Sequence, residues 1–476
     1  MNKLFKQPHL VTPSPDRRGG IQILAALCAA MLLSACATQD DGDVLFSDTE
    51  KAIIKTLVYT DPPDDPTSNY DQNSAAATLG QKFFMDVRFS GEILIQGNRT
   101  NTYAAGGSTS EGKIACVSCH SPNFGWADGT TRPNDVSLGT NFTDRNSPTI
   151  LNSVFNTYSL WDGSADSPWS LIRAPIEGPP QNFGRLGVAK VICGNATYQT
   201  EYDSVFDSST GMGAGSFTTT LCNAINTAYA ACSTTNYSRE YGKPGQTCYD
   251  TTLNATLAGS KTEVDKIFAN FAKAIAAYER KIVSKNSAFD QWAAGNENAM
   301  SVAQKRGLKV FINKGNCVRC HSGPNFSDGK FHNLGVPQVL LVGSTYDEGR
   351  NTGITKLLNT TTSNGYFNTA SVYNDGSTNR VSGLAAASSD VGAFKTPTLR
   401  SVSKTAPYFH NGSVESLWDV VNFYNFAGNG GNFPGTKDTI LTTRKMTNEE
   451  MEDLVNFLRA LDGEAIDSTL TANTAP

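Results

Sequence analysis

The chain is poor in charge and in histidine, and it has no long apolar run beyond its first residues. Lys, Arg, Asp and Glu make up 17% of the 476 residues, against roughly 25% in an average domain. The net charge is −5, and residues 1–35 carry a basic excess, so the rest of the chain is more acidic still. Nucleic-acid binders normally carry a basic excess, so no nucleic-acid partner is expected. No segment after the N-terminus approaches the roughly 20 apolar residues that a membrane-spanning helix needs.

Residues 1–35 have the pattern of a secretory signal peptide. Two arginines precede an apolar run over residues 21–33, and small residues follow, as is typical of export signals. Leu-Ser-Ala followed by Cys36 resembles a bacterial lipoprotein box, which implies lipidation of that cysteine. An uncleaved anchor and an ordinary signal are the alternatives. We therefore expect an exported lipoprotein that meets the membrane through its lipid anchor, and Ala37 favours the periplasmic side or surface of the outer membrane.

Four of the ten cysteines form two C-x-x-C-H motifs, Cys116 to His120 and Cys317 to His321. This spacing is that of haem c attachment, in which two thiols bind the haem and the histidine ligates its iron. A zinc site would need further Cys or His at short spacing, and a redox dithiol would not need the histidine twice. The sequence thus predicts two covalent haem c groups, bound through Cys116, Cys119, His120, Cys317, Cys320 and His321.

Four further cysteines lie in one polar stretch, the insertion over residues 190–260. They are Cys193, Cys222, Cys232 and Cys248. In an exported protein an even number of cysteines predicts disulfides. Three pairings are possible and the sequence does not choose among them, although closure of short loops weakly favours Cys193–Cys222 with Cys232–Cys248.

The surroundings of the two motifs match, which indicates a duplication. Cys-His-Ser-Pro-Asn-Phe124 parallels Cys-His-Ser-Gly-Pro-Asn-Phe326. A helical pattern precedes each motif, over residues 75–86 and 302–311. Capping boxes predict two further amphipathic helices, one that starts at Ser260 with Glu263, before the second motif, and a last one that starts at Thr447 with Glu450. We therefore predict a mainly α protein, with two tandem cytochrome c-like haem domains, long irregular loops and few short strands. The predicted segments are the signal peptide 1–35, a solvated tether 36–70, an N-terminal haem domain 71–290, a C-terminal haem domain 291–465 and a tail 466–476.

Histidine is scarce, and its distribution bears on the haem ligands. The chain has five, and none lies between His120 and His321. The first haem therefore lacks a nearby distal histidine and is expected to be open to a small ligand, unless His332 or His410 reaches it. We expect these two histidines to bond a haem propionate or the backbone rather than to act in catalysis.

Five runs carry a resemblance to a known family. They are Arg145–Thr149, Leu160–Gly163, Cys317–Asp328, Phe394–Arg400 and Thr405–Gly412. With these runs, the chain resembles the bacterial di-haem cytochrome c peroxidase family over roughly residues 74–462. The resemblance implies that the first haem is the peroxidatic site and the second the electron-entry site. It also implies a calcium ion between them, bound by the Asn146 side chain and the carbonyls of Thr405 and Pro407, with Trp161 between the haems. A core role is the alternative for Trp161.

Tyr424 stands where typical members of that family have a methionine ligand to the second iron. A tyrosine there resembles the methylamine-utilisation, MauG-like branch, in which the phenolate is the ligand. From spacing alone Tyr424 would be a core residue, because it shares a helix face with Leu417, Val420 and Val421. The resemblance favours ligation by Tyr424, and the rivals are Met446 and Met451.

One position departs from the family's pattern. Members place a glutamate over the peroxidatic iron as acid–base, and here that place falls on Gln181; Leu171 stands for a glutamine partner. Glutamine bonds peroxide but moves no proton, and losing a positioned acid–base typically costs roughly 10²–10⁴ in rate. Glu177 is the alternative acid–base.

Three functions fit these features. The first is a cytochrome-c peroxidase that reduces hydrogen peroxide at the N-terminal haem, with electrons from a small cytochrome c or cupredoxin relayed through the C-terminal haem. The second is a MauG-like oxidase that acts on a protein or organic substrate through high-valent iron. The third is a non-catalytic electron-transfer cytochrome, which the missing distal histidine disfavours. The natural reductant and substrate are not readable from the sequence, and a homodimer is allowed but not indicated.

Overall fold

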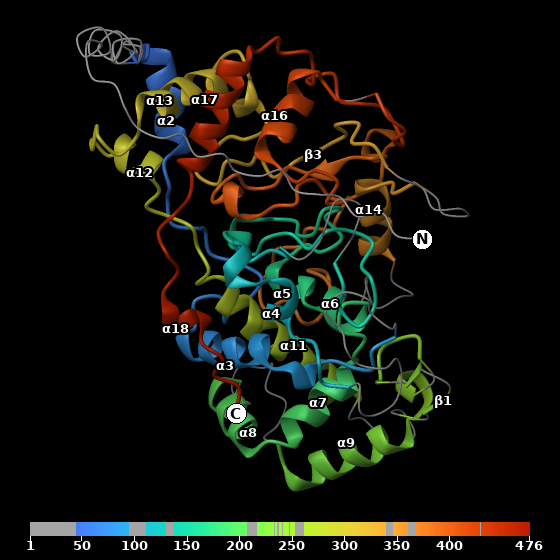
Figure 1. Cartoon of the computed structure of the whole chain (residues 1–476). Helices are drawn as coiled ribbons and strands as arrows, with labels where there is room; N and C mark the ends of the chain where they lie inside the picture. Colours follow the sequence, from blue (N-terminus) through green and yellow to red (C-terminus); the bar gives the residue numbers. More distant parts are fainter. Residues whose placement is uncertain are drawn as a thin grey trace, which may run out of the picture. The chain divides into compact units, whose positions relative to one another are not determined.

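Helices dominate the structure, and strands are few and short (Figure 1). The computed structural model describes residues 44–94, 111–129, 137–206, 217–232, 234–235, 238–239, 241–246, 248–252, 261–338, 346–359, 367–428 and 430–476. The predicted mainly α class is confirmed. The signal peptide and Cys36 lie outside the described residues, so cleavage and lipidation stay predictions.

The α-helices follow one another along the chain with long irregular connections between them. They are α2 (Asp48–Leu57), α3 (Ser74–Met85), α4 (Cys116–Cys119), α5 (Pro168–Leu171), α6 (Arg173–Glu177), α7 (Arg185–Cys193), α8 (Ala196–Val205), α9 (Thr219–Ala231), α11 (Lys261–Glu279), α12 (Ala288–Ala293), α13 (Val302–Ile312), α14 (Arg350–Leu358), α16 (Leu417–Asn425), α17 (Asn448–Arg459) and α18 (Ser468–Thr471). Short 3-10 turns and one π turn lie at Val87–Phe89, Pro122–Phe124, Ser153–Phe155, Cys248–Thr252, Cys317–Arg319, Ser388–Asp390 and Val402–Lys404.

Two antiparallel ladders complete the described secondary structure. Strand β1 (Thr234–Thr235) pairs with β2 (Ser238–Arg239), and β3 (Phe331–His332) pairs with β4 (Phe394–Lys395). In the second ladder Phe331 lies opposite Lys395. This ladder joins the segment just after the second C-x-x-C-H motif to one of the runs that carry the family resemblance.

Each C-x-x-C-H motif is framed by a crossed pair of helices. Helix α3 packs on α11 around the first motif, and α13 packs on α17 around the second. At both crossings the backbones meet at a glycine. A Cβ on Gly80 would lie 1.9 Å from the carbonyl oxygen of Ala274, and a Cβ on Gly307 would lie 1.9 Å from that of Asp453. The predicted duplication is therefore visible as the same helix crossing made twice.

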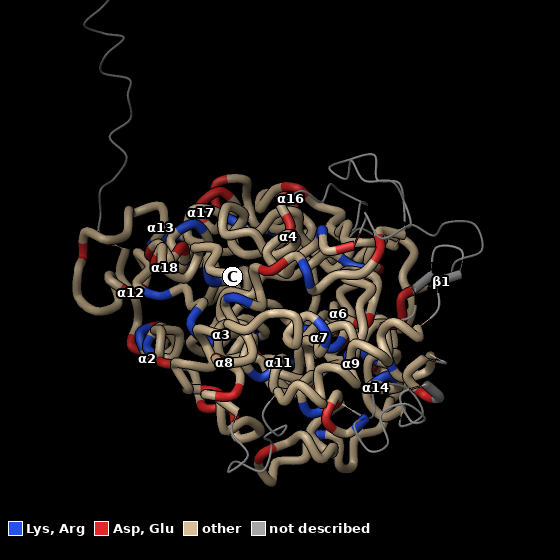
Figure 2. Tube along the Cα trace, turned by 90° about the horizontal axis from the view of Figure 1, so that it is seen from below, with Lys and Arg blue, Asp and Glu red and all other residues tan. Residues whose placement is uncertain are grey.

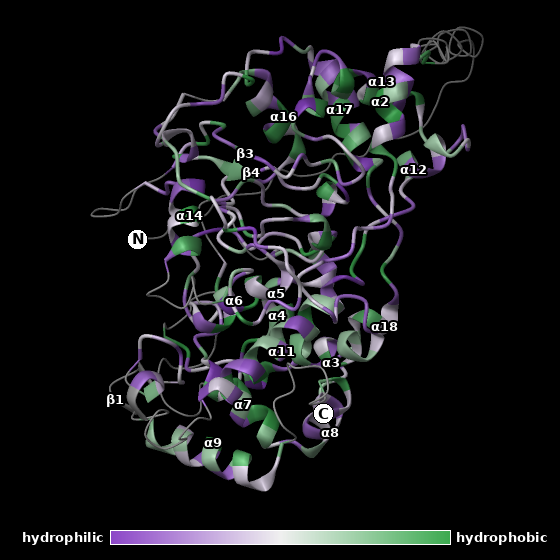
Figure 3. Cartoon of the chain, turned by 180° about the vertical axis from the view of Figure 1, so that it is seen from behind, coloured by the Kyte–Doolittle hydropathy of each residue, from purple (hydrophilic) through white to green (hydrophobic). Residues whose placement is uncertain are grey.

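The buried apolar side chains form two main clusters. One takes in residues from Tyr70 to Ile282 together with Phe367 and Tyr373, and the other takes in residues from Phe289 to Leu461. The two ends of the chain do not follow this order, because α2 contributes to the second cluster and Leu470 of α18 packs against the first. In Figure 1, α2 lies beside α13, and α18 lies beside α3. Helices α13 and α17 each carry hydrophobic and hydrophilic positions, as amphipathic helices do (Figure 3). The exact domain limits stay a prediction, because residues 45–476 make up one unit.

The tether predicted over residues 36–70 is wrong for residues 48–57, which form α2. Ser47 caps this helix, its side chain accepting from the backbone N–H of Glu50 while the Glu50 carboxylate accepts from the backbone N–H of Ser47. Ile54 and Leu57 are buried in the second cluster. The acidic and proline-rich composition around this segment hid a capping box followed by an apolar face.

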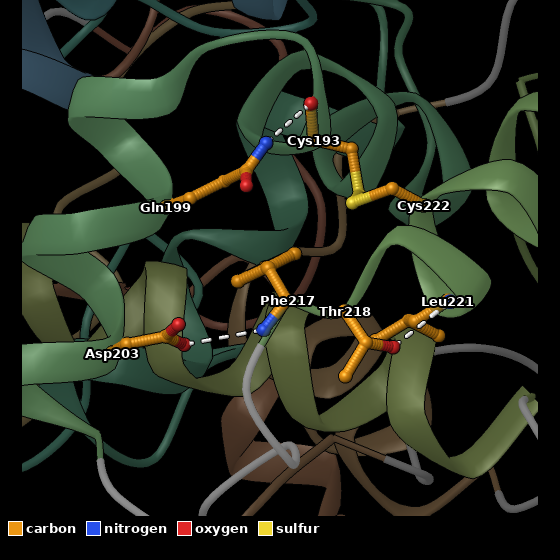
Figure 4. Close-up of a disulfide and its surroundings, with 7 residues drawn as sticks. All are labelled: Cys193, Gln199, Asp203, Phe217, Thr218, Leu221 and Cys222. Atoms are coloured by element: carbon orange, nitrogen blue, oxygen red, sulfur yellow. Dashed lines mark hydrogen bonds between the residues drawn. A yellow bond between two sulfur atoms is a disulfide. The ribbon is translucent and has the colours of Figure 1, made fainter.

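Two disulfides close the insertion, in the pairing that short-loop closure favoured. Cys193 at the end of α7 is bonded to Cys222 of α9, and Cys232 is bonded to Cys248. Around the first bond, Gln199 donates to the carbonyl of Cys193, and Thr218 caps α9 by accepting from the N–H of Leu221 (Figure 4). All four cysteines belong to the first cluster of buried side chains, so the two disulfides link the insertion covalently to that cluster.

Charged residues of both signs are interspersed along the described trace (Figure 2). This arrangement agrees with the low overall charge of the sequence. Among the helices that the structure describes, none has both the length and the apolar character required to cross a bilayer.

Candidate functional site

A cavity of about 680 Å³ brings the predicted site residues together. Both C-x-x-C-H motifs line it. So do the predicted calcium, inter-haem, proton-transfer and second-haem residues: Asn146, Trp161, Glu177, Gln181, Thr405, Pro407 and Tyr424. Residues from both halves of the chain therefore share one space.

The two predicted iron-binding histidines are held in the same way. The Nδ1 of His120 lies 3.3 Å from the carbonyl oxygen of Trp126, and the Nδ1 of His321 lies 2.9 Å from that of Phe326. Trp126 and Phe326 both have a positive φ, which marks the same turn in each copy. A histidine that donates Nδ1–H to a carbonyl presents Nε2 to a metal. Burial lowers the pKa of both histidines, which favours the neutral ring that ligation requires.

These features fit two haem c groups. The four thiols of the motifs are free rather than paired in disulfides. Each motif places its histidine in a fixed orientation beside its thiols. The cavity that they line is large and is bounded by apolar side chains such as Leu171, Ile172 and Leu454.

Near the first motif the cavity carries an amide. Gln181 is 3% exposed, and its Nε2 donates to the carbonyl of Phe89 at 3.1 Å. Its Oε1 accepts from the Cys116 thiol at 3.8 Å. The side chain therefore lies beside the first haem attachment point. Leu171, which stands in the place of the family's glutamine partner, also lines the cavity.

A carboxylate lies in the same part of the cavity. The Oε1 of Glu177 accepts from Arg185 Nε at 2.7 Å. Its Oε2 is buried without a hydrogen bond and lies 3.9 Å from Arg173 Nη1. One oxygen of Glu177 is thus fixed by an arginine, and the other is available for a further bond.

Between the motifs, Asn146 and Trp161 connect the two halves. The indole Nε1 of Trp161 donates to the carbonyl of Asn146 at 2.8 Å, and the N–H of Asn146 donates to the carbonyl of His410 at 2.8 Å. The N–H of Lys395 donates to the carbonyl of Trp161. Trp161 is therefore bonded on one side to the first half of the chain and on the other to the second.

The oxygen atoms around Asn146 suit a hard cation. Its Nδ2 donates to the carbonyl of Pro407 at 2.9 Å, whereas its Oδ1 is buried and has no hydrogen-bond partner. A buried carbonyl oxygen without a partner is costly unless something satisfies it. Oδ1 is therefore a fitting ligand for calcium, which takes oxygen donors only, and the Pro407 carbonyl lies against the Nδ2 of the same amide.

Near the second motif, one face of α16 borders the cavity. Leu417, Val420, Val421 and Tyr424 all line it, as their helical spacing predicts. The Tyr424 phenol is close enough to Cys317 and Cys320 for an electrostatic interaction with their sulfur atoms. Burial, above all, raises the pKa of this phenol. The hydroxyl therefore lies on the side of the second haem attachment site.

The two rival methionines lie in different places. Met446 lines the cavity. Met451 is not among the lining residues, and its sulfur accepts from Asn425 Nδ2 at 3.4 Å. Met446 is thus the methionine positioned to compete with Tyr424.

The two remaining histidines have other partners. The ring of His332 lies between two carboxylates, with Nδ1 2.6 Å from Asp438 and Nε2 3.1 Å from Asp328. The expected propionate or backbone bond is therefore wrong for His332, and Asp328 in particular raises its pKa to about 11. His410 stacks on Phe394, with ring centroids 3.7 Å apart, and burial lowers its pKa to about 3.

Sequence reasoning gave no role to several charged residues that line the cavity, among them half-buried Lys395 and buried Glu279. Lys395 donates to Asn156 Oδ1 at 3.2 Å, and burial lowers its pKa to about 8. Glu279 ends α11 beside the first motif. The available signals were a lysine inside a family run and a carboxylate directly after the apolar segment Ala274–Tyr278.

Comparison with known proteins identifies the family. A family model described as di-haem cytochrome c peroxidase matches residues 74–254 and 236–298. The cytochrome-c peroxidase IdrP1 of Pseudomonas sp. strain SCT is 29% identical over 415 residues, which cover 84% of each chain. The chain belongs to the di-haem cytochrome c peroxidase family. As a member of this family it is an oxidoreductase enzyme with two haem c groups.

Other members and related folds agree. The methylamine utilization protein MauG of Methylorubrum extorquens is 28% identical over 360 residues, 75% of each chain. A family model described as RoxA-like, cytochrome c-like, matches residues 393–425. The crystal structure of a MauG-like protein associated with microbial copper homeostasis has the same fold, with a TM-score of 0.55 at 20% identity, covering 87% of this chain and 97% of that one. The family thus includes both peroxidases and MauG proteins.

Proposed function

We propose that the protein reduces hydrogen peroxide at the N-terminal haem with electrons that enter through the C-terminal haem. The observation that carries this proposal is the shared cavity, which both C-x-x-C-H motifs line. The absence of any histidine between His120 and His321 leaves the first haem without a distal imidazole from that stretch. The overall change is H₂O₂ + 2 e⁻ + 2 H⁺ → 2 H₂O, and the electron donor is a small cytochrome c or cupredoxin.

Bound haem supplies the redox-active iron that peroxide reduction needs. The protein supplies the positioning groups. His120 holds its Nε2 toward the cavity through the bond of Nδ1 to Trp126. The amide of Gln181 orients peroxide by hydrogen bonding, and it neither takes up nor releases a proton.

Glu177 is the carboxylate that lies in the same part of the cavity as Gln181. Its Oε2 is buried and free of hydrogen bonds, so a proton can bind there without breaking an existing bond. Its Oε1 stays fixed by Arg185. We therefore assign proton transfer to Glu177 Oε2 and peroxide orientation to Gln181.

Trp161 and a calcium ion are proposed to couple the two haem sites. Trp161 is hydrogen-bonded to residues of both halves, and it lines the same cavity. Asn146 Oδ1 and the carbonyls of Thr405 and Pro407 are the proposed calcium ligands. The ion would join the first half to the second, because Asn146 comes from one half and the carbonyls come from the other.

A second function is favoured by Tyr424. Its phenol lies on the side of the second haem attachment site, and relatives include MauG proteins. We propose as the alternative a MauG-like oxidase that oxidises a protein or organic substrate. An oxidase of this kind would consume peroxide without a reduced cytochrome when its substrate is present.

We also propose that the protein is exported and held by lipid at Cys36, on the periplasmic side or surface of the outer membrane. The signal-like residues 1–35 support this proposal. Mass spectrometry of protein purified from membranes should find an N-terminal lipid on Cys36, and Cys36→Ala should release the protein into the soluble fraction.

The peroxidase proposal is tested by stopped-flow oxidation of a ferrous monohaem cytochrome c by peroxide. The purified di-haem protein should catalyse this oxidation, and Cys116→Ala, which impairs attachment of the first haem, should abolish it. Cys193→Ala with Cys222→Ala is the control, because it replaces two cysteines that form a disulfide and do not line the cavity. If the wild type consumes peroxide only when an organic or protein substrate is added, the oxidase is the correct function.

A further inference from the structure

Glu279 is a buried acid with no role in the proposed reaction. It is 5% exposed, it lines the cavity beside the first motif, and its Oε2 is buried without a hydrogen-bond partner. The carboxylate receives a hydrogen bond from Ser153. Within the part of the chain that the structure describes, no lysine or arginine forms an ion pair with it.

The cations on the helices that pack against α11 have other partners. Lys82 of α3 pairs with Glu201, and Arg185 of α7 pairs with Glu177 and Asp265. Lys190, also of α7, lies over the ring of Tyr229. Helix α5, which also packs on α11, has no charged residue. The charge of Glu279 is therefore not neutralised by its surroundings.

Two other titratable groups face Glu279. One is the thiol of Cys116, and the other is the hydroxyl of Tyr278, which donates to the carbonyl of Leu470 at 2.6 Å. A thioether cannot ionise, so haem attachment removes the acid at Cys116. Burial raises the pKa of Tyr278 above its usual range, which keeps that phenol neutral. Glu279 is then the group whose charge can change near this edge of the first haem.

Burial raises the pKa of Glu279 to about 8. Its carboxyl therefore binds and releases a proton close to neutral pH. Reducing a nearby haem iron by one electron lowers the local charge by one unit, and in a buried site this favours the neutral acid. Linkage requires the reverse effect as well: a proton on the carboxyl must favour the reduced haem.

We propose that Glu279 is the redox-linked protonation site of the first haem. When one electron from the donor converts Fe(III) to Fe(II), one proton from solvent binds to the carboxylate of Glu279, and reoxidation releases it. The carboxyl thus offsets the charge that the electron adds to the buried site. The inference rests on the two haem groups of the family and does not depend on peroxide being the substrate.

Spectroelectrochemical titration of both haems, at steps from about pH 5 to about pH 10, tests this assignment. The midpoint potential of the first haem should fall as pH rises, by at most 59 mV per pH unit for one proton per electron. Glu279→Gln keeps the size of the neutral acid and should flatten this dependence. Glu297→Gln is the control, since Glu297 is an exposed acid paired with Lys305, and it should leave the dependence unchanged.

Ser153→Ala gives an independent readout. It removes a hydrogen bond that stabilises the carboxylate, so the pH-dependent range of the potential should move to higher pH, a shift that a purely structural role would not produce. If Glu279→Gln retains the wild-type slope, the proposal is overturned. If that variant fails to bind haem, the Ser153→Ala shift decides, and an unshifted range overturns the proposal too. A protein that shows the slope but does not reduce peroxide would refute the peroxidase function and support this inference.

Discussion

Gly307→Ala is expected to destabilise the protein and to perturb the second haem selectively. A Cβ at this position would lie 1.9 Å from the carbonyl oxygen of Asp453 and 2.8 Å from the Cβ of Phe457. Real Cβ atoms essentially never approach another heavy atom within 3.0 Å. Helices α13 and α17 must therefore separate by about 1 Å at the crossing to accept the methyl group.

The expected magnitude combines two opposing effects. Overpacking a well-packed interior costs about 1–3 kcal/mol, whereas replacing glycine by alanine within a helix contributes about 1 kcal/mol of stability. Because the clash is with backbone, we expect a cost at the upper end and a net loss of about 2 kcal/mol. In a large domain this corresponds to a fall in Tm of roughly 4–8 °C.

The substitution should also change the spectrum of the second haem, because α13 and α17 contribute side chains to the wall of its cavity. Phe311 of α13 and Leu454 of α17 line the cavity near the second motif, so their displacement should alter the second haem and leave the first unchanged. Gly80→Ala should do the reverse, because α3 crosses α11 beside the first motif. Thermal unfolding followed by circular dichroism, together with EPR of the ferric protein, measures both effects.

Gly194→Ala is the control for this pair. Gly194 has a φ of −80°, and the nearest atom to its added Cβ lies at 3.4 Å, so the free energy of unfolding should change by no more than about 0.5 kcal/mol. A neutral Gly307→Ala, or one that perturbs the first haem, would refute the reasoning from the duplicated crossing.

Three further predictions concern the ligands and the acid–base. Tyr424→Met should raise the potential of the second haem, because a neutral thioether replaces an anionic oxygen, whereas Met446→Leu should leave its EPR spectrum unchanged; the opposite pair of results would make Met446 the ligand. Gln181→Glu should raise the rate of peroxide turnover by about tenfold or more, since it adds a carboxylate at nearly constant size. Glu177→Gln, which removes the assigned proton-transfer group, should lower the rate by roughly 10²–10⁴, and an unchanged rate in that variant would contradict the assignment to Glu177. Calcium chelation by EDTA, and Asn146→Ala, should alter both haem spectra together, and a protein without calcium in metal analysis would contradict this.

The haem attachment sites and the framing helices were predictable because their signals are local. The C-x-x-C-H spacing fixes the attachment chemistry, and the apolar periodicity of residues 75–86 and 302–311 gave α3 and α13 within a residue of their observed ends. The capping box of Thr447 and Glu450 at the start of α17 was equally readable.

What could not be predicted depends on contacts far apart in the chain. Helix α2 packs against residues more than 200 positions later in the chain. Its local sequence is a capped amphipathic segment within an acidic, proline-rich stretch, and it does not show which residues cover the apolar face. The partners of His332 include Asp438, whose closeness requires the folded β3 region. Glu279 is unusual only because the fold buries it without a cation, and no local pattern reports that.

The duplication also explains where function must differ between the halves. Both copies place a histidine Nδ1 against the carbonyl of a residue with positive φ, and both cross their helices at a glycine. The two copies therefore share the arrangement of the proximal histidine, so this arrangement cannot explain a difference in function between them. Gln181, Glu177 and Glu279 line only the first haem's side, and Tyr424 lines only the second's. The two carboxyls near the first motif and the phenol near the second support the proposed division, in which peroxide is reduced at the first haem and electrons enter through the second.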